Sequence, residues 1–222
     1  LAPGWSQIPE VGLALAAKAA KINGVYSAMA LLDLDTAKAK KYTDTKSVKE
    51  ESGYTSPFCY PLWPCDRVGE YILAKSAVAG AMIQYMASDN EDVPNQSPSN
   101  HLLGVGGQCL EDGTEVYLDQ DQANTVNGYG VTTAINQNGY RLWGNYTGAY
   151  PASSDAKDIW FAVRRMFSWQ GNNFIQTYFD EVDDPMNNVL VQSVVDSENI
   201  RCSAYAPKYW AGASIEYKSD DN

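Results

Sequence analysis

The stretch GVTTAINQNGYRLWGNYTGAYP, residues 130–151, decides how the second half of the chain folds. Two runs with strand character flank Asn138 and Gly139, two residues that accept the positive φ of a tight hairpin turn. The aromatic residues here and just downstream are Tyr140, Trp143, Tyr146, Tyr150, Trp160 and Trp169. Because aromatic rings in strands usually pack, we predict a hairpin that adds rings to a core. A platform of presented rings that binds sugar is the alternative.

The composition is that of a globular protein with one large domain or two small ones. Of the 222 residues, 45% are hydrophobic and 19% are charged, which is ordinary globular usage. The apolar runs are shorter than the roughly 20 residues that a helix needs to cross a bilayer, so we expect no membrane partner. A formal net charge of -11 without a Lys/Arg stripe argues against a nucleic-acid partner.

The first half alternates helix and strand signals. Residues 9–22 form an amphipathic pattern with Pro9 in the first turn, and residues 72–89 form a helical pattern of small residues. Residues 25–35 and 55–63 are apolar runs typical of strands buried on both faces. This order predicts an α/β fold with a mostly parallel sheet and flanking helices.

The second half predicts an α+β region that ends in a helical hairpin. Apolar residues recur at helical spacing in residues 163–182 and again in residues 184–200. Asp184 is the expected cap of the second helix, and Pro185 its first residue. Gly171 lies on the apolar stripe of the first helix, where a glycine costs about 1 kcal/mol relative to alanine, so we expect a close backbone contact there.

We expect two regions, residues 1–118 and residues 119–222, which can together form one compact unit. The chain does not begin with Met, and it ends in a polar tail after a short strand signal at residues 213–217. We therefore expect a trimmed core of a longer protein.

The cysteines do not form a recognisable site. Cys59, Cys65, Cys109 and Cys202 contain no CxxC pair and are too few for a disulfide scaffold. We expect reduced thiols in the core and a cytoplasmic setting for folding.

Few residues point to catalysis. His101 is the only histidine, which removes most triad and metal-site hypotheses, and no GxSxG or phosphate-binding loop is present. Asp33 and Asp35 follow a predicted buried strand, where an α/β fold places ligand-binding residues. They suggest a metal-dependent hydrolase, but acids that end a strand and cap the next element are the simpler interpretation. Asp119 and Asp121 are typical of a helix start. We predict no catalytic, cofactor-binding or metal-binding residues, and no cofactor.

A resemblance to a known family extends over nearly the whole chain. Residues 123–172, with the motifs GYRLWGNYT and VRRMF, and residues 183–200 resemble tail sheath proteins of contractile bacteriophages and phage-tail-like particles. In the first half, the stretches ALLDLD, YPLWPC, SAVAGAM and SPSNHLLGVGG follow the order of the sheath region called subtilisin-like. That label concerns shape alone, since no protease triad is present.

The resemblance implies a structural protein and not an enzyme. Sheath subunits polymerise helically around a tail tube and contract by rearranging their interfaces without nucleotide hydrolysis. The implied partners are other sheath subunits, the tail tube protein, and baseplate and tail terminator proteins. The implied location is the virion tail, assembled in the cytoplasm of a bacterial host.

The resemblance also implies an assembly site at the end of the chain. Terminal arms of sheath proteins add strands to the sheets of neighbouring subunits. In this sequence the corresponding strand residues are Ser214, Ile215, Glu216 and Tyr217. Without complete arms, we expect the 222-residue chain to be monomeric.

Overall fold

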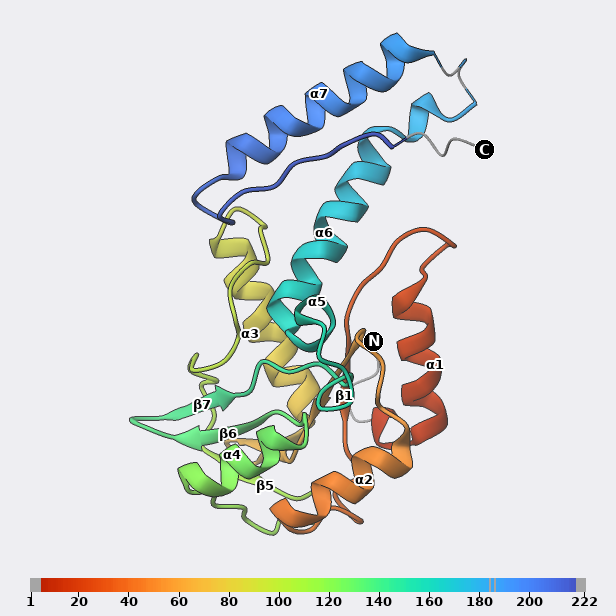
Figure 1. Ribbon diagram of the computed structural model, residues 1–222. Helices are drawn as coiled ribbons and strands as arrows, with labels where there is room; N and C mark the ends of the chain where they lie inside the picture. Colours follow the sequence, from red (N-terminus) through yellow and green to blue (C-terminus); the bar gives the residue numbers. More distant parts are fainter. Residues whose placement is uncertain (1–4, 184, 186, 219–222) are drawn as a thin grey trace. The chain divides into compact units, whose positions relative to one another are not determined.

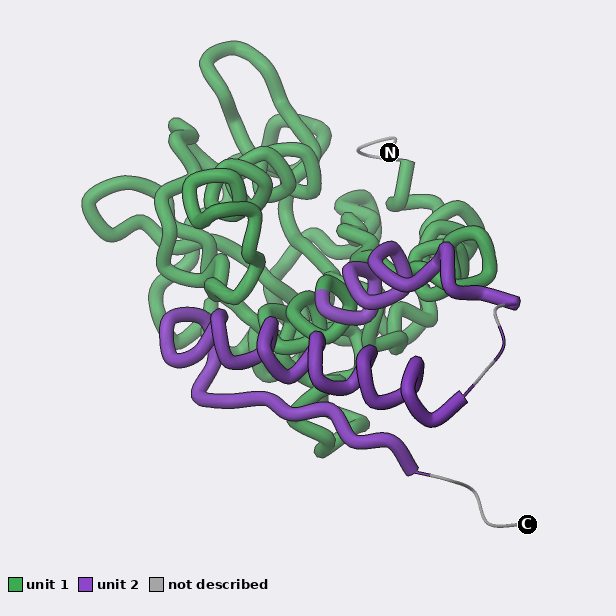
Figure 2. The backbone as a smooth tube through the Cα atoms, turned by 90° about the horizontal axis from the view of Figure 1, so that it is seen from above, with its two compact units in different colours: residues 1–169 green, residues 170–222 purple. Residues whose placement is uncertain are grey.

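The computed structural model describes residues 5–183, 185 and 187–218. The chain divides into two compact units, Leu1–Trp169 and Gln170–Asn222, which are coloured separately in Figure 2. Both helices and strands are present, so the α/β class is confirmed.

The bounds of the elements follow the chain in order. The helices are α1 (Pro9–Ala20), α2 (Thr45–Ser52), α3 (Lys75–Asp89), α4 (Gln120–Gly128), α5 (Ala156–Ile159), α6 (Phe161–Thr177) and α7 (Asn188–Tyr205). The 3-10 helices are η1 (Trp5–Gln7), η2 (Tyr42–Asp44) and η3 (Phe179–Glu181). The strands are β1 (Ala30–Asp33), β2 (Cys59–Leu62), β3 (Cys65–Val68), β4 (Tyr71–Leu73), β5 (Gly107–Cys109), β6 (Thr133–Asn136) and β7 (Tyr140–Trp143).

The central strands of the first unit run β1, β2, β6, β7. β1 and β2 are parallel, with Ala30 opposite Cys59 and Asp33 opposite Leu62. A parallel bridge from Leu62 to Thr132 then joins β2 to the start of β6. α1 and α3 both contact β1 and lie on either side of it in Figure 1. Two predicted helices, α1 and α3, therefore pack against a predicted buried strand, β1, which pairs with a second one, β2.

Among the described residues, parallel pairing is limited to that region. β4, β3 and β5 form a separate antiparallel sheet, and β6 pairs with β7 in the antiparallel sense. The helix expected over residues 72–89 begins only at Lys75, because Ile72 and Leu73 pair with β3 across a tight turn. The short turn between β3 and β4 permits only antiparallel pairing, which is why this part departs from the expected parallel order.

The hairpin predicted at Asn138 and Gly139 is confirmed. β6 and β7 are joined there with Asn136 opposite Tyr140. Asn138 has φ 52° and Gly139 has φ 105°, the left-handed conformations that this short connection requires.

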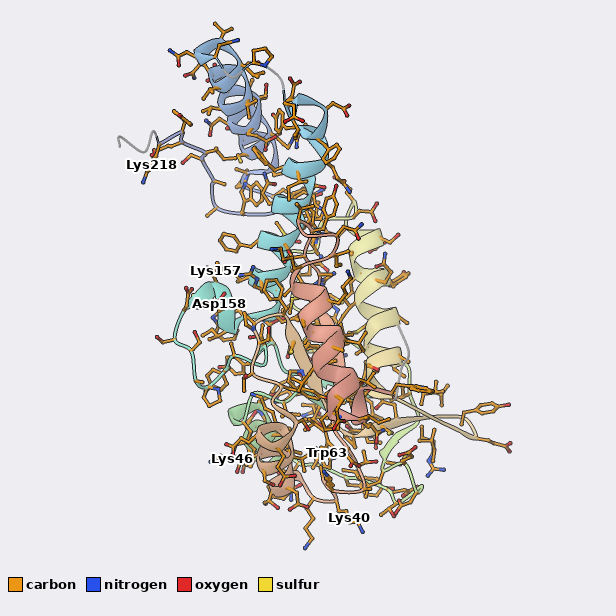
Figure 3. The ribbon with its side chains drawn as sticks, turned by 90° about the vertical axis from the view of Figure 1, so that its right-hand side faces the viewer. Lys40, Lys46, Trp63, Lys157, Asp158 and Lys218 are labelled. Carbon is orange, nitrogen blue, oxygen red and sulfur yellow. The ribbon has the colours of Figure 1, made fainter. Side chains whose placement is uncertain are left out.

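The core of the first unit is built around large side chains. Trp63 is fully buried, and its indole Nε1–H donates to the carbonyl of Ala39 at 2.8 Å; Figure 3 shows it inside the first unit. Tyr60 stacks on Phe161 with ring centroids 4.0 Å apart. Burying one such aromatic ring removes 150–250 Å² of surface from water, so these rings account for much of the stability of the unit.

The second unit contains the end of α6, η3 and α7, which form the predicted helical hairpin. Asn187 caps α7, since its side-chain oxygen accepts the backbone N–H of Leu190 at 3.0 Å. The cap predicted at Asp184 lies outside the described residues, and Pro185 precedes α7 without being part of it. The prediction for Gly171 is wrong: apart from its chain neighbours and the backbone of its own helix, no described atom lies within 4 Å of a Cβ built there.

The strand predicted at residues 213–217 is wrong, since the structure forms none there. Residues 113–118 contribute only a bridge between Glu115 and Cys109. No helix in the described part of the chain is long and apolar enough to cross a membrane.

Candidate assembly site

The predicted assembly residues form an exposed segment beside α7. After α7 the chain turns back and runs alongside that helix (Figures 1 and 2). Ser214 and Glu216 are exposed, Ile215 is half-buried, and Tyr217 is 65% exposed. We call Ser214–Tyr217 the 214–217 segment.

Asn199 of α7 holds the 214–217 segment. Its side-chain Oδ1 accepts the backbone N–H of Ile215 at 2.9 Å, and its Nδ2 donates to the carbonyl of Ile215 at 3.1 Å. One turn along α7, the carbonyl of Cys202 accepts the indole N–H of Trp210 at 3.0 Å. Two side-chain to backbone anchors therefore attach this returning chain to the helix.

A buried carboxylate lies in the same helical hairpin. Glu198 is fully buried, and its carboxylate lies 3.1 Å from Nη1 of Arg201 and accepts the Gln170 amide at 3.2 Å. Desolvation raises the pKa of the neighbouring Tyr178 hydroxyl, and its hydrogen bond to Glu198 acts in the same direction. Because a buried charge is costly without partners, these contacts fix how α6 and α7 meet within the second unit.

Asp33 and Asp35 serve different local roles. Asp33 is buried and accepts the backbone N–H of Ser76 at 2.8 Å, the hydroxyl of Ser76 at 2.5 Å and the hydroxyl of Ser6 at 3.1 Å. It thereby satisfies the first turn of α3. Asp35 is half-exposed and accepts the backbone N–H of Ala37 at 2.9 Å. Asp33 is thus a capping residue, but it caps α3 and not the element that follows β1; Asp35 is the one that caps the turn directly after the strand.

The other candidate catalytic residues are not brought together. His101 is exposed. Asp119 forms a capping box with Gln122, as its helix-start pattern predicted. Within the described residues, no group of His, Cys, Asp and Glu is arranged to hold a metal ion.

The four cysteines are free and buried. Burial raises the pKa of the Cys59 thiol to about 11, so the nucleophilic thiolate is disfavoured. Cys65 and Cys109 lie opposite each other across β3 and β5, a pairing that their sequence spacing did not reveal.

The aromatic residues of the opening stretch pack against one another. Tyr140 is buried, while Tyr146 is half-buried between Tyr150, at 3.9 Å between ring centroids, and Trp160, at 4.7 Å. The indole N–H of Trp143 donates to Asn124 at 2.9 Å. Rings stacked on each other do not offer a row of open faces to a sugar, so packing is the better-supported interpretation.

Two buried lysines were not predicted from the sequence. Lys75 forms an ion pair with Asp66 in which both side chains are fully buried, and burial raises the pKa of the Asp66 carboxyl while the charge of Lys75 opposes that shift. Lys49 lines a cavity of about 220 Å³ and donates to the carbonyls of Tyr129, at 2.9 Å, and Tyr150, at 2.5 Å. Burial lowers the pKa of Lys49 to about 8. The carbonyl partners of Lys49 lie 80 and 101 residues away in sequence. Asp66 is nine residues from Lys75, but it lies on β3 and not on the helix of Lys75, so no helical spacing marks the pair.

Comparison with known proteins adds to this picture. No family model and no curated protein matches the chain. It matches the anti-feeding prophage helical sheath in the contracted state with a TM-score of 0.65 and 18% identity, over 93% of this chain and 53% of that one. It matches the PVC sheath complex of an extracellular contractile injection system with a TM-score of 0.61 and 17% identity, over 86% of this chain and 51% of that one.

A third solved structure is the sheath tail protein from Desulfitobacterium hafniense. Its TM-score is 0.56 at 10% identity, over 89% of this chain and 44% of that one. At such identities the likeness is one of fold. The chain therefore has the fold of sheath proteins from contractile tails and prophage-like injection systems, and the resemblance seen in the sequence is confirmed at that level. The chain spans about half the length of the sheath chains that it matches.

Proposed function

We propose that the protein is a structural subunit of a contractile tail sheath. It polymerises with other copies around a tail tube and contracts by rearrangement of subunit interfaces. The observation that carries this proposal is the sheath fold, found over 93% of the chain. The proposal also includes two sheath regions, residues 1–118 and residues 119–222. The first of them is expected to have the subtilisin-like shape.

The local chemistry supports a structural role. The hydrogen bonds of Asp33 cap α3, Lys49 and Lys75 hold elements of the first unit together, and the cysteine thiols are buried. The energy for contraction then comes from contacts between subunits, without nucleotide hydrolysis. We propose that the tail tube, baseplate and tail terminator proteins are its further partners.

The proposed location is the tail of a virion or a phage-tail-like particle, assembled in the cytoplasm of the bacterial host. The exposed aliphatic and aromatic side chains of the second unit support contact with other subunits. They are Phe179, Val182, Val189, Ile200 and Tyr217. Assembly would cover them, as expected for an interaction surface.

Electron microscopy of the natural full-length protein tests the proposal. We expect striated tubes, and tubes that enclose an inner tube when a tail tube protein is co-expressed. A protein that stays monomeric at all concentrations would contradict the proposal.

The metal-dependent hydrolase is not favoured. Turnover of a generic ester or phosphate substrate with divalent metal, abolished by Asp33→Asn, would revive that hypothesis. Binding on a glycan array that is lost in Tyr146→Ala would revive the sugar-binding alternative.

A further inference from the structure

The amine of Lys49 lies at the wall of a cavity of about 220 Å³. Its Nζ donates to the carbonyls of Tyr129, at 2.9 Å, and Tyr150, at 2.5 Å, and both of these residues also line the cavity. Two further lining residues, Lys46 and Ala152, are exposed, and Figure 3 shows Lys46 at the surface of α2. The cavity is therefore open to small molecules from the solvent.

The surroundings of Lys49 favour the unprotonated amine. A buried ammonium group is costly unless a carboxylate compensates its charge. Lys75, which is also buried, has such a partner in Asp66. Within the described residues, the ion pairs do not include Lys49, although its side chain is buried. An unprotonated amine has two N–H groups, which the two carbonyls accept, and its lone pair stays free.

The charged groups near Lys49 do not reverse this preference. Burial lowers the pKa of Lys49 to about 8 and outweighs the opposing effects of Cys59 and Glu50. Burial also raises the pKa of the Cys59 thiol to about 11, so the thiol is uncharged at neutral pH, and Glu50 and Lys46 are exposed. At pH 7.5 about a quarter of the Lys49 amines are therefore unprotonated, against about 0.1% for a lysine in water. A desolvated amine of this kind is a nucleophile.

We propose that Lys49 is an acylation site, at which a small activated acyl group, such as the acetyl group of an acyl phosphate or a thioester, is transferred to Nζ and lies in the cavity. This inference does not depend on the proposed function. The cavity volume of about 220 Å³ is several times the roughly 30 Å³ that a water molecule takes up in the liquid, so an acetyl group has room beside the amine.

The transfer is a substitution at the acyl carbon. The lone pair of Nζ attacks that carbon and forms the C–N bond, the bond from the carbon to the phosphate oxygen or thioester sulfur breaks, and the leaving group takes its electron pair. Nζ releases one proton to the solvent. The amide product keeps one N–H, which still donates to one of the two carbonyls that hold the free amine.

Peptide mass spectrometry of the natural full-length protein tests the site. The protein is treated with a limiting amount of acetyl phosphate or of the thioester S-acetyl-N-acetylcysteamine. At pH 7.5 we expect Lys49 to be acetylated about tenfold faster than Lys46, because burial restricts access to an amine that is otherwise far more often unprotonated. Lys75, held by Asp66, should stay unmodified.

The pH profile separates an activated Lys49 from a merely accessible one. The rate at Lys49 should level off above about pH 8, whereas the rate at an exposed amine keeps rising to about pH 10. In urea, where burial is lost, Lys49 and Lys46 should react at equal rates.

A variant at the exposed wall tests the role of the cavity. Ala152→Trp fills the space beside the amine and should slow acetylation of Lys49 about tenfold while the rate at Lys46 is unchanged. Ala152→Ser is the control and should react like wild type.

The outcomes are distinct. Faster labelling of Lys49 by either donor supports the proposal, and the faster donor identifies the chemical class. Equal labelling of Lys49 and Lys46 in the folded protein by both donors would overturn it. An unchanged rate at Lys49 in Ala152→Trp would also overturn it, because the acyl group would then not enter the cavity.

Discussion

The two units differ in how many of their side chains they bury. The first unit buries Trp63, Tyr54, Tyr60 and Phe161 completely, and distant parts of the same chain supply the hydrogen-bond partners of Lys49 and Trp63. In the second unit, only Glu198 and Cys202 are buried among the described residues, and Val189 and Ile200 are 79% and 72% exposed.

The difference suggests a division of labour. A small unit buries too little apolar surface to be very stable by itself, and surface left exposed on such a unit is available to a partner. The first unit therefore buries its own core, whereas the second leaves apolar side chains exposed, as the proposed assembly requires.

The largest effect is expected from Trp63→Ala in the first unit. Removing a fully buried indole leaves a cavity and an unsatisfied Ala39 carbonyl, so the free energy of unfolding should fall by about 4 kcal/mol in urea denaturation. The control is Trp5→Ala, because Trp5 is 62% exposed; that change should cost no more than about 0.5 kcal/mol. Equal effects would show that the first unit lacks a dominant core.

The second largest effect is expected from breaking the buried ion pair between Lys75 and Asp66. Lys75→Met leaves the Asp66 carboxyl buried without its partner, at a cost of about 3 kcal/mol. The control is Lys38→Met, since Lys38 and Glu51 are 57% and 64% exposed and 3.9 Å apart; a surface pair of this kind contributes about 0.5 kcal/mol. The double variant Asp66→Asn with Lys75→Met should recover part of the loss. Urea titrations of the four proteins measure these differences.

Lys49 gives the first unit a characteristic pH dependence. Its pKa is lowered to about 8 from 10.5, so between these values the unfolded chain holds a proton that the folded chain lacks. The contribution of Lys49 to the free energy of unfolding therefore rises as the pH rises from about 8 to 10.5. From pH 7 to about pH 9.5, wild type should gain about 2 kcal/mol relative to Lys49→Met.

The matched control for Lys49 is Lys46→Met, because Lys46 is an exposed lysine of the same helix (Figure 3). The free energy of unfolding of Lys46→Met should change with pH by the same amount as that of wild type over this range. An unchanged difference between wild type and Lys49→Met over that range would show that Lys49 keeps its proton in the folded protein.

The smallest effect is expected in the second unit. Glu198→Gln removes the charge that faces Arg201 at 3.1 Å while keeping the shape of the side chain. We expect a local loss of about 1 kcal/mol, seen as faster amide exchange in α7 with no change in the first unit. Asp196→Asn, on the exposed face of α7, is the control. Faster exchange throughout both units would show that they unfold together.

Local signals predicted much of this fold. Asn138 and Gly139 marked the hairpin because their allowed φ values are a property of the residues themselves. Pro9 and the apolar stripe placed α1, and Asp119 marked the start of α4.

Contacts between distant residues could not be predicted. Lys49 meets carbonyls 80 and 101 residues away in sequence, and the pairing of β3 with β5 depends on how the intervening chain folds. Residues 213–217 were predicted as a strand but form none, and Asn199 carried no sign of being the hydrogen-bond partner of Ile215. A contact between one side chain and the backbone of one residue leaves no periodic pattern, which is why the segment was predicted as an ordinary strand.

The most direct test of the account is a high-resolution helical reconstruction of tubes formed by the natural full-length protein. The account predicts a first unit that keeps the fold described here, and contacts with another subunit that cover Val189 and Ile200 of the second unit. Tubes in which Val189 and Ile200 face solvent would contradict it.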